Sequence, residues 1–217
     1  MIAPFNPDKK MPDQSNSTRF GIVRHAQTVW NREKKIQGQS DSPLTPDGES
    51  QAVHWGRLLR QFSWDRILAS DIGRAMETAK IINQALDLSL QTDSRLREQD
   101  WGQWTGKTIS QLKTDSPREL EKQVRSGWDF CPPGGEGRRS VLERSHRALR
   151  EAAQKWPGDD ILVVTHEGVV KSVIYHLCGR KFLPGEPAVI RPYQLHLLIH
   201  DKEGLRLEEL NALAMEL

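Results

Sequence analysis

The chain has 217 residues, of which 36% are hydrophobic and 28% charged, a composition that is typical of a folded, soluble domain and excludes a disordered chain. Its 31 basic and 29 acidic residues leave a formal net charge of +2, and the absence of a dense Lys/Arg run disfavours nucleic acid as a partner. The two cysteines, Cys131 and Cys178, form no CxxC pair, so we expect a reducing compartment, the cytoplasm, and no structural zinc site. No apolar run reaches the roughly 18 residues of a membrane span, and no membrane partner is expected.

The first 18 residues are rich in Pro, Asp, Asn and Ser, and we predict that residues 1–18 form a flexible tail without a secretory signal. Beyond them, short apolar runs alternate with helical patterns. The predicted strands are residues 19–24, 66–69, 88–92, 160–165 and 194–200. The predicted helices begin at Thr45, which would cap a helix with Pro46 at its first position, extend over 72–86 and 140–156, and follow Gly168.

The alternation of strands and helices predicts an α/β fold with a mostly parallel central sheet. Near the end of the chain, DKEG at 201–204 separates two strand-like runs and indicates a hairpin, so we expect an antiparallel edge strand. Residues 104–139 interrupt the alternation with a polar segment that ends in a Pro/Gly-rich stretch. We predict that this segment is a helical and loop excursion that could act as a lid, and that residues 19–217 form a single domain.

Charged side chains follow four of the predicted strands, where each strand ends. Arg24 and His25 follow the first, Arg74 lies in the helical turn after the second, Glu98 follows the third and His166 follows the fourth. Ligands of open α/β sheets bind beyond the carboxyl ends of the parallel strands. The sequence therefore predicts that these five side chains converge on one site.

These residue types favour a phosphoryl ligand. Arginine binds phosphate oxygens bidentately and keeps its charge at any working pH, and a helix that begins near His166 would offer backbone N–H groups to the same anion. An uncharged imidazole is a competent nucleophile toward phosphorus, and neighbouring arginines would lower the pKa of His25. A phosphate dianion would raise the pKa of Glu98, which could then protonate a leaving alkoxide. The set predicts phosphoryl transfer without a metal.

Six segments resemble, in order, the motifs of the histidine phosphatase superfamily, the phosphoglycerate mutase-like group. They are VRHAQTVWN (23–31), QGQSDSPLTPDG (37–48), SDIGRAMETA (70–79), LREQDWGQWTG (96–106), PPGGEG (132–137) and VVTHEGVVKS (163–172). Their combination is specific, whereas RH alone carries little information. The resemblance implies a three-layer α/β/α sandwich and no metal cofactor.

Matched by position, the resemblance also implies roles for individual residues. His25 would be phosphorylated during turnover, Glu98 would be the proton donor, and Arg24, Arg74 and His166 would bind the phosphoryl group. The predicted substrate-binding residues are Arg24, Asn31, Gln37, Gly38, Arg74, His166 and Glu167, and no metal ligand is predicted.

Three positions depart from the family pattern, which often reads RHGET where this chain has RHAQT. Ala26 replaces a glycine and demands a negative φ. Gln27 replaces a glutamate and removes a carboxylate from near the pocket. Glu167 stands where small or neutral residues are usual, so it would repel a phosphate unless its side chain points away, and it is a second candidate for the proton donor.

The expected activity is metal-independent hydrolysis of phosphomonoesters, in the phosphatase branch of the family, with a small phosphorylated metabolite as the partner. A cofactor-dependent phosphoglycerate mutase is the alternative; mutases that resemble this chain usually carry a longer segment in place of residues 104–139. A non-catalytic phospholigand-binding scaffold is a second alternative, disfavoured because all five pocket residues are present. Sugar phosphates, phosphoglycerate, nucleotide-like phosphates such as α-ribazole phosphate, and phosphoproteins remain open as substrates, as does the oligomeric state.

Two further features have two interpretations each. Trp101 and Trp104 could line the pocket or only pack. The basic pair Arg138 and Arg139 could contact a distal anion of the substrate or be solvated at the start of a helix.

Overall fold

The computed structural model describes residues 17–216. Residues 1–16 of the predicted tail lie outside the described part, and the first strand, β1 (Thr18–Arg24), begins at the last residue of that predicted tail. Four other strands begin within one residue of their predicted starts: β2 (Arg66–Ala69), β3 (Ser89–Thr92), β4 (Asp160–Thr165) and β5 (Gln194–Asp201). The sixth strand, β6 (Gly204–Ala214), is the strand-like run predicted to follow the DKEG turn.

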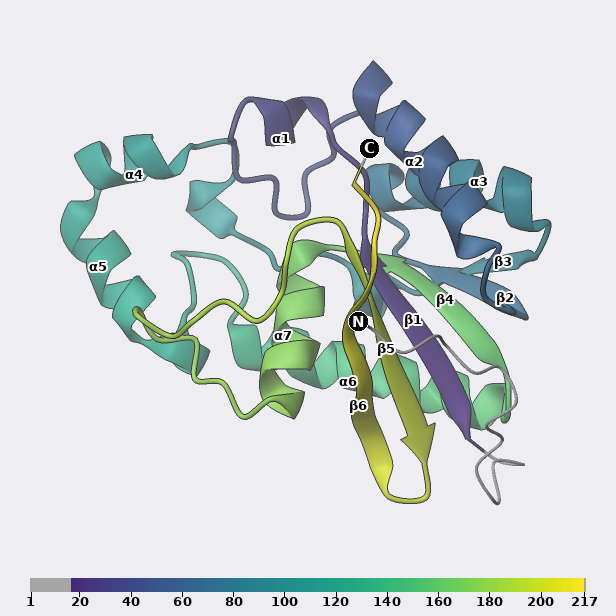
Figure 1. Ribbon diagram of the computed structural model, residues 1–217. Helices are drawn as coiled ribbons and strands as arrows, with labels where there is room; N and C mark the ends of the chain where they lie inside the picture. The colour runs from purple at the N-terminus through teal and green to yellow at the C-terminus, as the bar shows by residue number, and fades with distance from the viewer. Residues whose placement is uncertain (1–16, 217) are drawn as a thin grey trace, which may run out of the picture.

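Within the described residues, the strands form a six-stranded sheet in the order β3-β2-β4-β1-β5-β6 (Figure 1). Strands β3, β2, β4 and β1 are parallel to one another, while β5 is antiparallel to both β1 and β6. The turn between β5 and β6 is the predicted hairpin. The mostly parallel sheet with an antiparallel edge is therefore confirmed.

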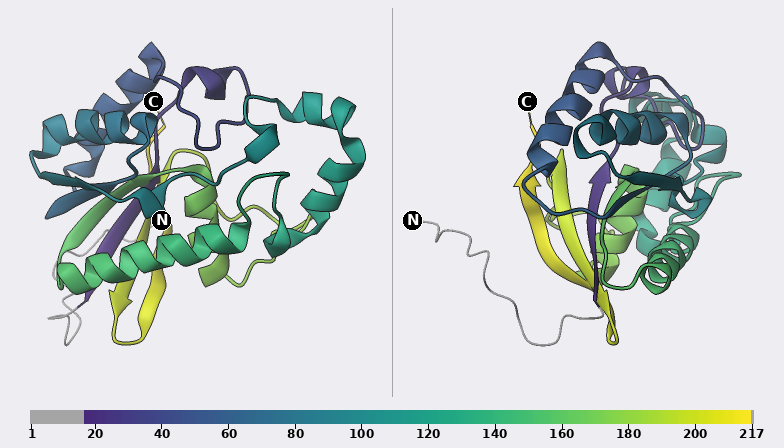
Figure 2. Two further views of the ribbon diagram at one scale, coloured as in Figure 1. Left: turned by 180° about the vertical axis from the view of Figure 1, so that it is seen from behind. Right: turned by 90° about the vertical axis from the view of Figure 1, so that its right-hand side faces the viewer.

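Helices cover both faces of the sheet, which makes three layers (Figure 2). Helices α2 (Pro46–Leu59) and α3 (Gly73–Leu86) pack on the face that presents Val23, Leu162 and Val164. Helices α6 (Arg138–Lys155) and α7 (Glu167–Leu177) pack on the opposite face. Alternate residues of the central strands are buried against each layer, because successive side chains of a strand point to opposite faces. The predicted α/β/α sandwich is confirmed.

Local sequence signals explain where the helices begin. The Thr45 side chain accepts a hydrogen bond from the backbone N–H of Gly48, and Pro46 occupies the first position of α2, as predicted. Helix α7 begins at Glu167, earlier than the predicted start after Gly168, with His166 as its N-cap residue. None of the helices in residues 17–216 is both long and apolar enough to cross a lipid bilayer.

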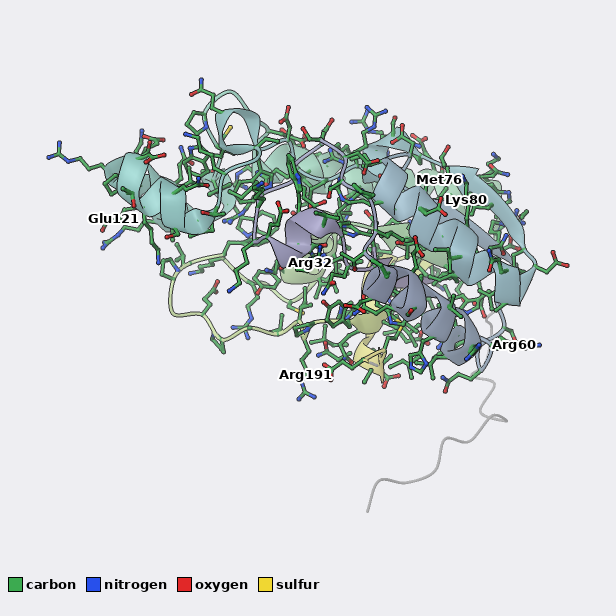
Figure 3. All side chains as sticks on the ribbon, turned by 90° about the horizontal axis from the view of Figure 1, so that it is seen from above. Arg32, Arg60, Met76, Lys80, Glu121 and Arg191 are labelled. Carbon is green, nitrogen blue, oxygen red and sulfur yellow. The ribbon has the colours of Figure 1, made fainter. Side chains whose placement is uncertain are left out.

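The predicted excursion is a small helical unit beside the sheet. After the short 3₁₀ turns η1 (Ser94–Leu96) and η2 (Gly102–Trp104), the chain forms α4 (Ile109–Asp115), α5 (Pro117–Arg125) and η3 (Gly127–Asp129). The excursion has a core of its own, made of Trp104, Leu112, Leu120 and Phe130. From above, Glu121 of α5 lies at the opposite end of the molecule from Arg60, which ends α2 (Figure 3).

Candidate active site

The carboxyl ends of three central strands meet at one edge of the sheet. Arg24 at the end of β1 is in register with Thr165 of β4, and Ala69 at the end of β2 is in register with Val164. The residues that follow these strands, His25, Ser70 and His166, are therefore brought together although they are far apart in the sequence. A cavity of about 410 Å³ opens at this edge.

The predicted site residues converge on this cavity. Its lining includes Arg24, His25, Asn31, Gln37, Gly38, Arg74, Glu98 and Glu167. The predicted residue His166 is fully buried and is not part of the lining, but its ring centroid is 5.2 Å from that of His25. Of the two tryptophans, Trp101 lines the cavity, while Trp104 is buried in the core of the excursion.

The hydrogen bonds of His25 define its tautomer. Its Nδ1 lies 2.7 Å from the carbonyl oxygen of Ala26, which can only accept, so Nδ1 carries the proton. The other ring nitrogen, Nε2, accepts a hydrogen bond from Nε of Arg74 at 3.1 Å. Burial, with the charges of Arg24 and Arg74, holds the pKa of His25 well below its ordinary value. The imidazole is therefore uncharged, and the lone pair of Nε2 is on the side of the Arg74 guanidinium.

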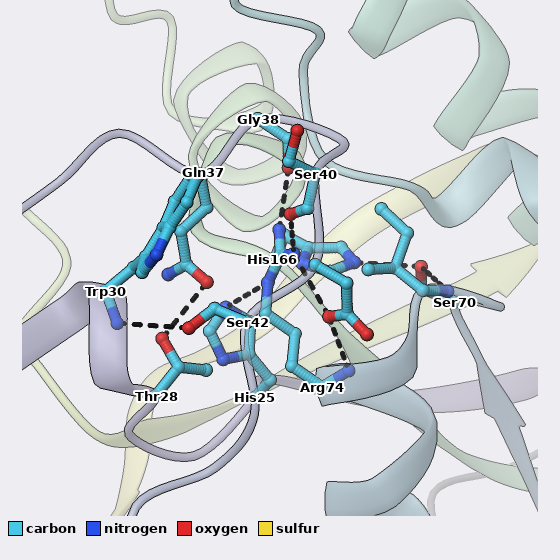
Figure 4. Close-up of polar contacts among 12 residues, drawn as sticks. His25, Thr28, Trp30, Gln37, Gly38, Ser40, Ser42, Ser70, Arg74 and His166 are labelled. Atoms are coloured by element: carbon cyan, nitrogen blue, oxygen red, sulfur yellow. Dashed lines mark hydrogen bonds and ion pairs between the residues drawn. The ribbon is translucent and has the colours of Figure 1, made fainter. Parts of the chain in front are cut away.

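Arg74 is buried and fixed in place by backbone oxygens (Figure 4). Its Nη1 donates to the carbonyl of Ser40 and its Nη2 to that of Gly38, both at 2.8 Å. Gly38 adopts a φ of +53°, and a Cβ there would meet Thr105 Oγ1 at 3.0 Å, so the position favours glycine. Gly38 thus acts on the site through its backbone, by orienting the guanidinium.

His166 occupies the N-cap position of α7, and Ser70 fixes its ring. The Nε2 atom of His166 lies 2.8 Å from Oγ of Ser70, while its buried Nδ1 has no hydrogen-bond partner among residues 17–216. Burial, together with the nearby His25 and arginine side chains, lowers the pKa of His166 well below its ordinary value. A buried polar atom without a partner is costly, and it is a feature that a bound anion could satisfy.

Glu98 rests against the N-terminus of α7. Its Oε1 accepts hydrogen bonds from the backbone N–H of Gln99 at 2.8 Å and of Gly168 at 3.1 Å. Burial raises the pKa of Glu98, although these amides and the charge of Arg74 partly offset the increase. A Cβ on residue 168 would lie 2.2 Å from Oε1, so only glycine allows this approach.

A partly buried ion pair holds the backbone of Glu98. Arg144 of α6 pairs with Glu136 at 2.7 Å and donates to the carbonyl oxygens of Glu98 at 3.1 Å and Arg95 at 2.6 Å. Glu136 belongs to the PPGGEG segment, so this motif acts on the site indirectly, through Arg144. The sequence pattern does not indicate this role, because the acceptors are backbone carbonyls.

Glu167 does not point away from the cavity, and two cations neutralise it instead. Its Oε2 accepts from Nη1 of Arg24 at 2.6 Å, and its Oε1 pairs with Nζ of Lys171, one helical turn away. Although burial raises the pKa of Glu167, the charges of Arg24 and Lys171 outweigh this effect and lower it. Of the two candidate proton donors, Glu98 therefore has the environment of an acid and Glu167 that of a stable carboxylate.

The polar residues of the opposite wall are also oriented. Asn31, in the short helix α1 (Val29–Arg32), accepts through Oδ1 from the backbone N–H of Thr28 at 3.0 Å, which leaves its Nδ2 donors for a ligand. Gln37 accepts from Thr28 Oγ1 at 3.0 Å. Gln27 is bonded to Thr45 at 2.9 Å and contributes nothing to the lining, and the backbone N–H of the buried Ala26 donates to Thr78.

Ser70, Ser40 and Lys171 also belong to this site, and none of the three was among the predicted site residues. Ser70 and Lys171 lie inside the quoted motifs, so the motifs themselves were the signal for them. Ser40 contributes only a carbonyl oxygen, which any residue type could supply.

A family model described as "Histidine phosphatase superfamily (branch 1)" matches residues 20–213. The chain belongs to the histidine phosphatase superfamily. A protein named "Probable phosphoglycerate mutase GpmB" from Salmonella choleraesuis (strain SC-B67) is 41% identical over 145 residues, 67% of each chain. Bacillus stearothermophilus YhfR has a similar structure, with a TM-score of 0.83 at 27% identity over 91% of this chain and 98% of that one. The structure of a mycobacterial glucosyl-3-phosphoglycerate phosphatase in complex with VO3 is also similar, with a TM-score of 0.78 at 27% identity. The match covers 90% of this chain and 99% of that one.

This member of the superfamily has, within residues 17–216, no group of three or more His, Cys, Asp or Glu side chains arranged to hold a metal ion. The donor set of the cavity consists instead of guanidinium, imidazole and amide groups, which suit an anion.

Proposed function

We propose that the protein is a metal-independent phosphatase that hydrolyses phosphomonoesters through a phosphohistidine intermediate on His25. The observation that carries this proposal is the state of the His25 ring. Its Nδ1–H donates a hydrogen bond to the Ala26 carbonyl, and its Nε2 carries no proton and lies beside the Arg74 guanidinium. A buried, uncharged and oriented imidazole is the form that can attack phosphorus.

In the first step, Nε2 of His25 forms a bond to phosphorus while the bond from phosphorus to the ester oxygen breaks. Glu98 gives its proton to the departing alkoxide and becomes a carboxylate. The raised pKa of Glu98 supports this role, because it keeps the acid protonated to a higher pH. The alcohol then leaves and phosphohistidine remains.

In the second step, the Glu98 carboxylate takes a proton from a water molecule that attacks the phosphoryl group. The bond from phosphorus to Nε2 breaks, inorganic phosphate leaves, and His25 and Glu98 return to their starting protonation states. One group thus serves as acid and then as base, as microscopic reversibility of a two-step transfer requires.

The phosphoryl oxygens would be bound by Arg24, Arg74 and Asn31, with the unpartnered Nδ1 of His166 as a further donor. Arginine suits this role because its planar fork matches phosphate geometry. Arg74 already has two nitrogens held by carbonyls, so it is preorganised and little entropy is lost on binding. Such fixed donors stabilise the transition state most strongly where negative charge develops on the phosphoryl oxygens.

A phosphoglycerate mutase is the second candidate, because relatives at 40–41% identity are named "Probable phosphoglycerate mutase GpmB". The phosphatase is favoured by the short excursion and by the similarity, over 90% of this chain, to a solved structure that is named a phosphatase. We further propose a small phosphorylated metabolite as the substrate and the cytoplasm as the location, which the free thiols of Cys131 and Cys178 support.

A panel of phosphomonoesters assayed with a chelator present, with His25→Ala beside the wild type, tests the proposal. We expect phosphate release by the wild type in chelator and none by His25→Ala. Abolition of the wild-type activity by the chelator would contradict the metal-independent mechanism. Transfer of the phosphoryl group between the hydroxyls of phosphoglycerate, faster than phosphate release, would assign the mutase instead.

A further inference from the structure

The cations around the cavity differ in one respect, which is whether a carboxylate neutralises them. Arg24 and Lys171 pair with Glu167, Lys35 pairs with Glu33, and the Arg74 guanidinium lies 3.7 Å from Asp41. Arg138 also lines the cavity, and no carboxylate among residues 17–216 lies within ion-pair distance of it. Its charge is therefore uncompensated by the described part of the chain.

Arg138 is held firmly, although it lacks an ion pair. Its guanidinium carbon lies 4.2 Å from the ring centroid of Phe130 and 4.4 Å from that of Phe182, so the two rings stack on it. Its Nη1 donates to the carbonyl oxygen of Gly127 at 2.8 Å. Burial lowers the pKa of Arg138 to about 10, which leaves it cationic at neutral pH.

This geometry leaves one edge of the guanidinium free. With Nη1 engaged by Gly127, the Nε and Nη2 atoms remain as two parallel N–H donors, the edge that binds a carboxylate or phosphate bidentately. The rings hold the plane of the guanidinium, so the direction of this edge is fixed before a ligand arrives.

The surroundings of Arg138 carry a structural cost. Phe182 has a φ of +59°, which is unfavourable for a bulky residue, yet its ring also packs on Tyr175 at 4.4 Å and Trp128 at 4.7 Å. In addition, Arg138 occupies the first turn of α6, where the helix dipole disfavours a cation. Strain of this kind gathers at functional sites.

The neighbouring Arg139 shows the contrasting arrangement. It is exposed, it pairs with Asp129 at 2.7 Å, and it does not line the cavity. The two interpretations of the basic pair therefore divide between its members: Arg139 is a solvated surface residue, and Arg138 belongs to the wall of the site.

We propose that Arg138 binds a second anionic group on the organic part of the substrate, which makes the substrate class phosphomonoesters that also carry a carboxylate or a second phosphate. This inference rests on the proposed phosphatase function, because the first phosphate is taken to sit at His25. It assigns Arg138 a role in selecting the substrate, while the phosphoryl clamp of Arg24 and Arg74 is common to all phosphomonoesters.

Two matched substrate pairs test the inference and separate the two kinds of anion. 3-Phosphoglycerate and glycerol 3-phosphate differ by a carboxylate in place of a hydroxymethyl group, and fructose 1,6-bisphosphate and fructose 6-phosphate differ by a second phosphate. The ratio of kcat/KM within each pair is measured for the wild type, for Arg138→Met, which keeps an unbranched apolar stem and removes the charge, and for the control Arg139→Met.

We expect the wild type to prefer the anionic member of at least one pair, and Arg138→Met to lower that ratio at least about tenfold, chiefly through KM. Arg139→Met should leave the ratio unchanged. Arg138→Lys keeps the charge but lacks the bidentate edge, so it should lower the ratio by a smaller factor, and it serves as the test if Arg138→Met fails to fold.

The inference is overturned if the wild type shows no preference in either pair, or if Arg138→Met slows both members of a pair equally, as a purely structural role would. These outcomes leave His25-dependent hydrolysis intact. By contrast, the absence of any hydrolysis that depends on His25 contradicts the proposed function itself, so the two failures are distinguishable.

Discussion

Replacing Gly168 by alanine tests the role of Glu98 without touching the carboxylate itself. The added Cβ would lie 2.2 Å from Oε1 of Glu98 and 3.2 Å from its Cδ. Since ordinary contact begins near 3.4 Å, the carboxylate must retreat by about 1 Å or the first turn of α7 must shift. Either movement also lengthens the hydrogen bonds from the Gly168 N–H to the carboxylate, now 3.1 and 3.2 Å.

The effect on activity should exceed the effect on stability. A displacement of about 1 Å in a catalytic group costs roughly 100-fold in rate, equivalent to about 2.7 kcal/mol. For the free energy of unfolding, the helix propensity of alanine offsets the weakened hydrogen bonds, and we expect a change within about 1 kcal/mol. The variant should therefore be folded and slow.

The assay compares kcat/KM for an alkyl phosphate, such as glycerol 3-phosphate, with that for p-nitrophenyl phosphate. The alkoxide needs a proton to leave, whereas p-nitrophenolate does not, so Gly168→Ala should slow the alkyl ester far more. Gly137→Ala is the matched control, because its Cβ would meet nothing closer than 3.9 Å. Equal losses for both esters, or no loss for either, would refute the assignment of Glu98 as the acid.

Three further predictions concern Glu98, Glu167 and the buried Trp55. Glu98 must be protonated to act as the acid, and its pKa is raised. The value of kcat/KM for an alkyl phosphate should therefore fall as the pH rises through that pKa. Glu98→Gln should remove this decrease at alkaline pH from the profile. Glu167→Gln removes a negative charge beside the anionic substrate, because the lowered pKa of Glu167 keeps its carboxylate ionised. KM should therefore fall a few-fold at low ionic strength, and the difference from the wild type should shrink as salt is added. A higher KM would show instead that Glu167 orients Arg24. Trp55 is fully buried, and its indole N–H donates to the Met215 carbonyl. Trp55→Phe should therefore lower the free energy of unfolding, measured with urea, by about 2–4 kcal/mol. An unchanged midpoint of urea unfolding would contradict this expectation.

The positions of His25, Arg74, Glu98 and His166 could be predicted because the topology of a parallel sheet carries the information. An apolar run followed by a charged residue shows where a strand ends, and parallel strands end at one edge. The convergence of these residues on one cavity required no knowledge of side-chain conformation.

The contacts that orient the site could not be predicted in the same way. Arg74 is held by the carbonyls of Gly38 and Ser40, and Arg144 holds the carbonyl of Glu98. Every residue has a carbonyl group, so the sequence carries no signal for these bonds. The sequence predicts that Glu167 repels a phosphate unless its side chain points away, and only the structure shows that Arg24 and Lys171 neutralise it.

The atom of His25 that becomes phosphorylated tests the central claim most directly. Glu98→Gln lacks both the acid of the first step and the base of the second, and p-nitrophenyl phosphate needs only the second because its leaving group departs without a proton. A rapid alkaline quench of this variant with p-nitrophenyl phosphate should therefore trap the intermediate for mass spectrometry and phosphorus NMR. Because Nδ1–H donates to Ala26 at 2.7 Å, we predict phosphorylation at Nε2 of His25 and none in a variant that also carries His25→Ala. A phosphoryl group on Nδ1, on another residue, or on no residue while turnover continues would contradict the mechanism.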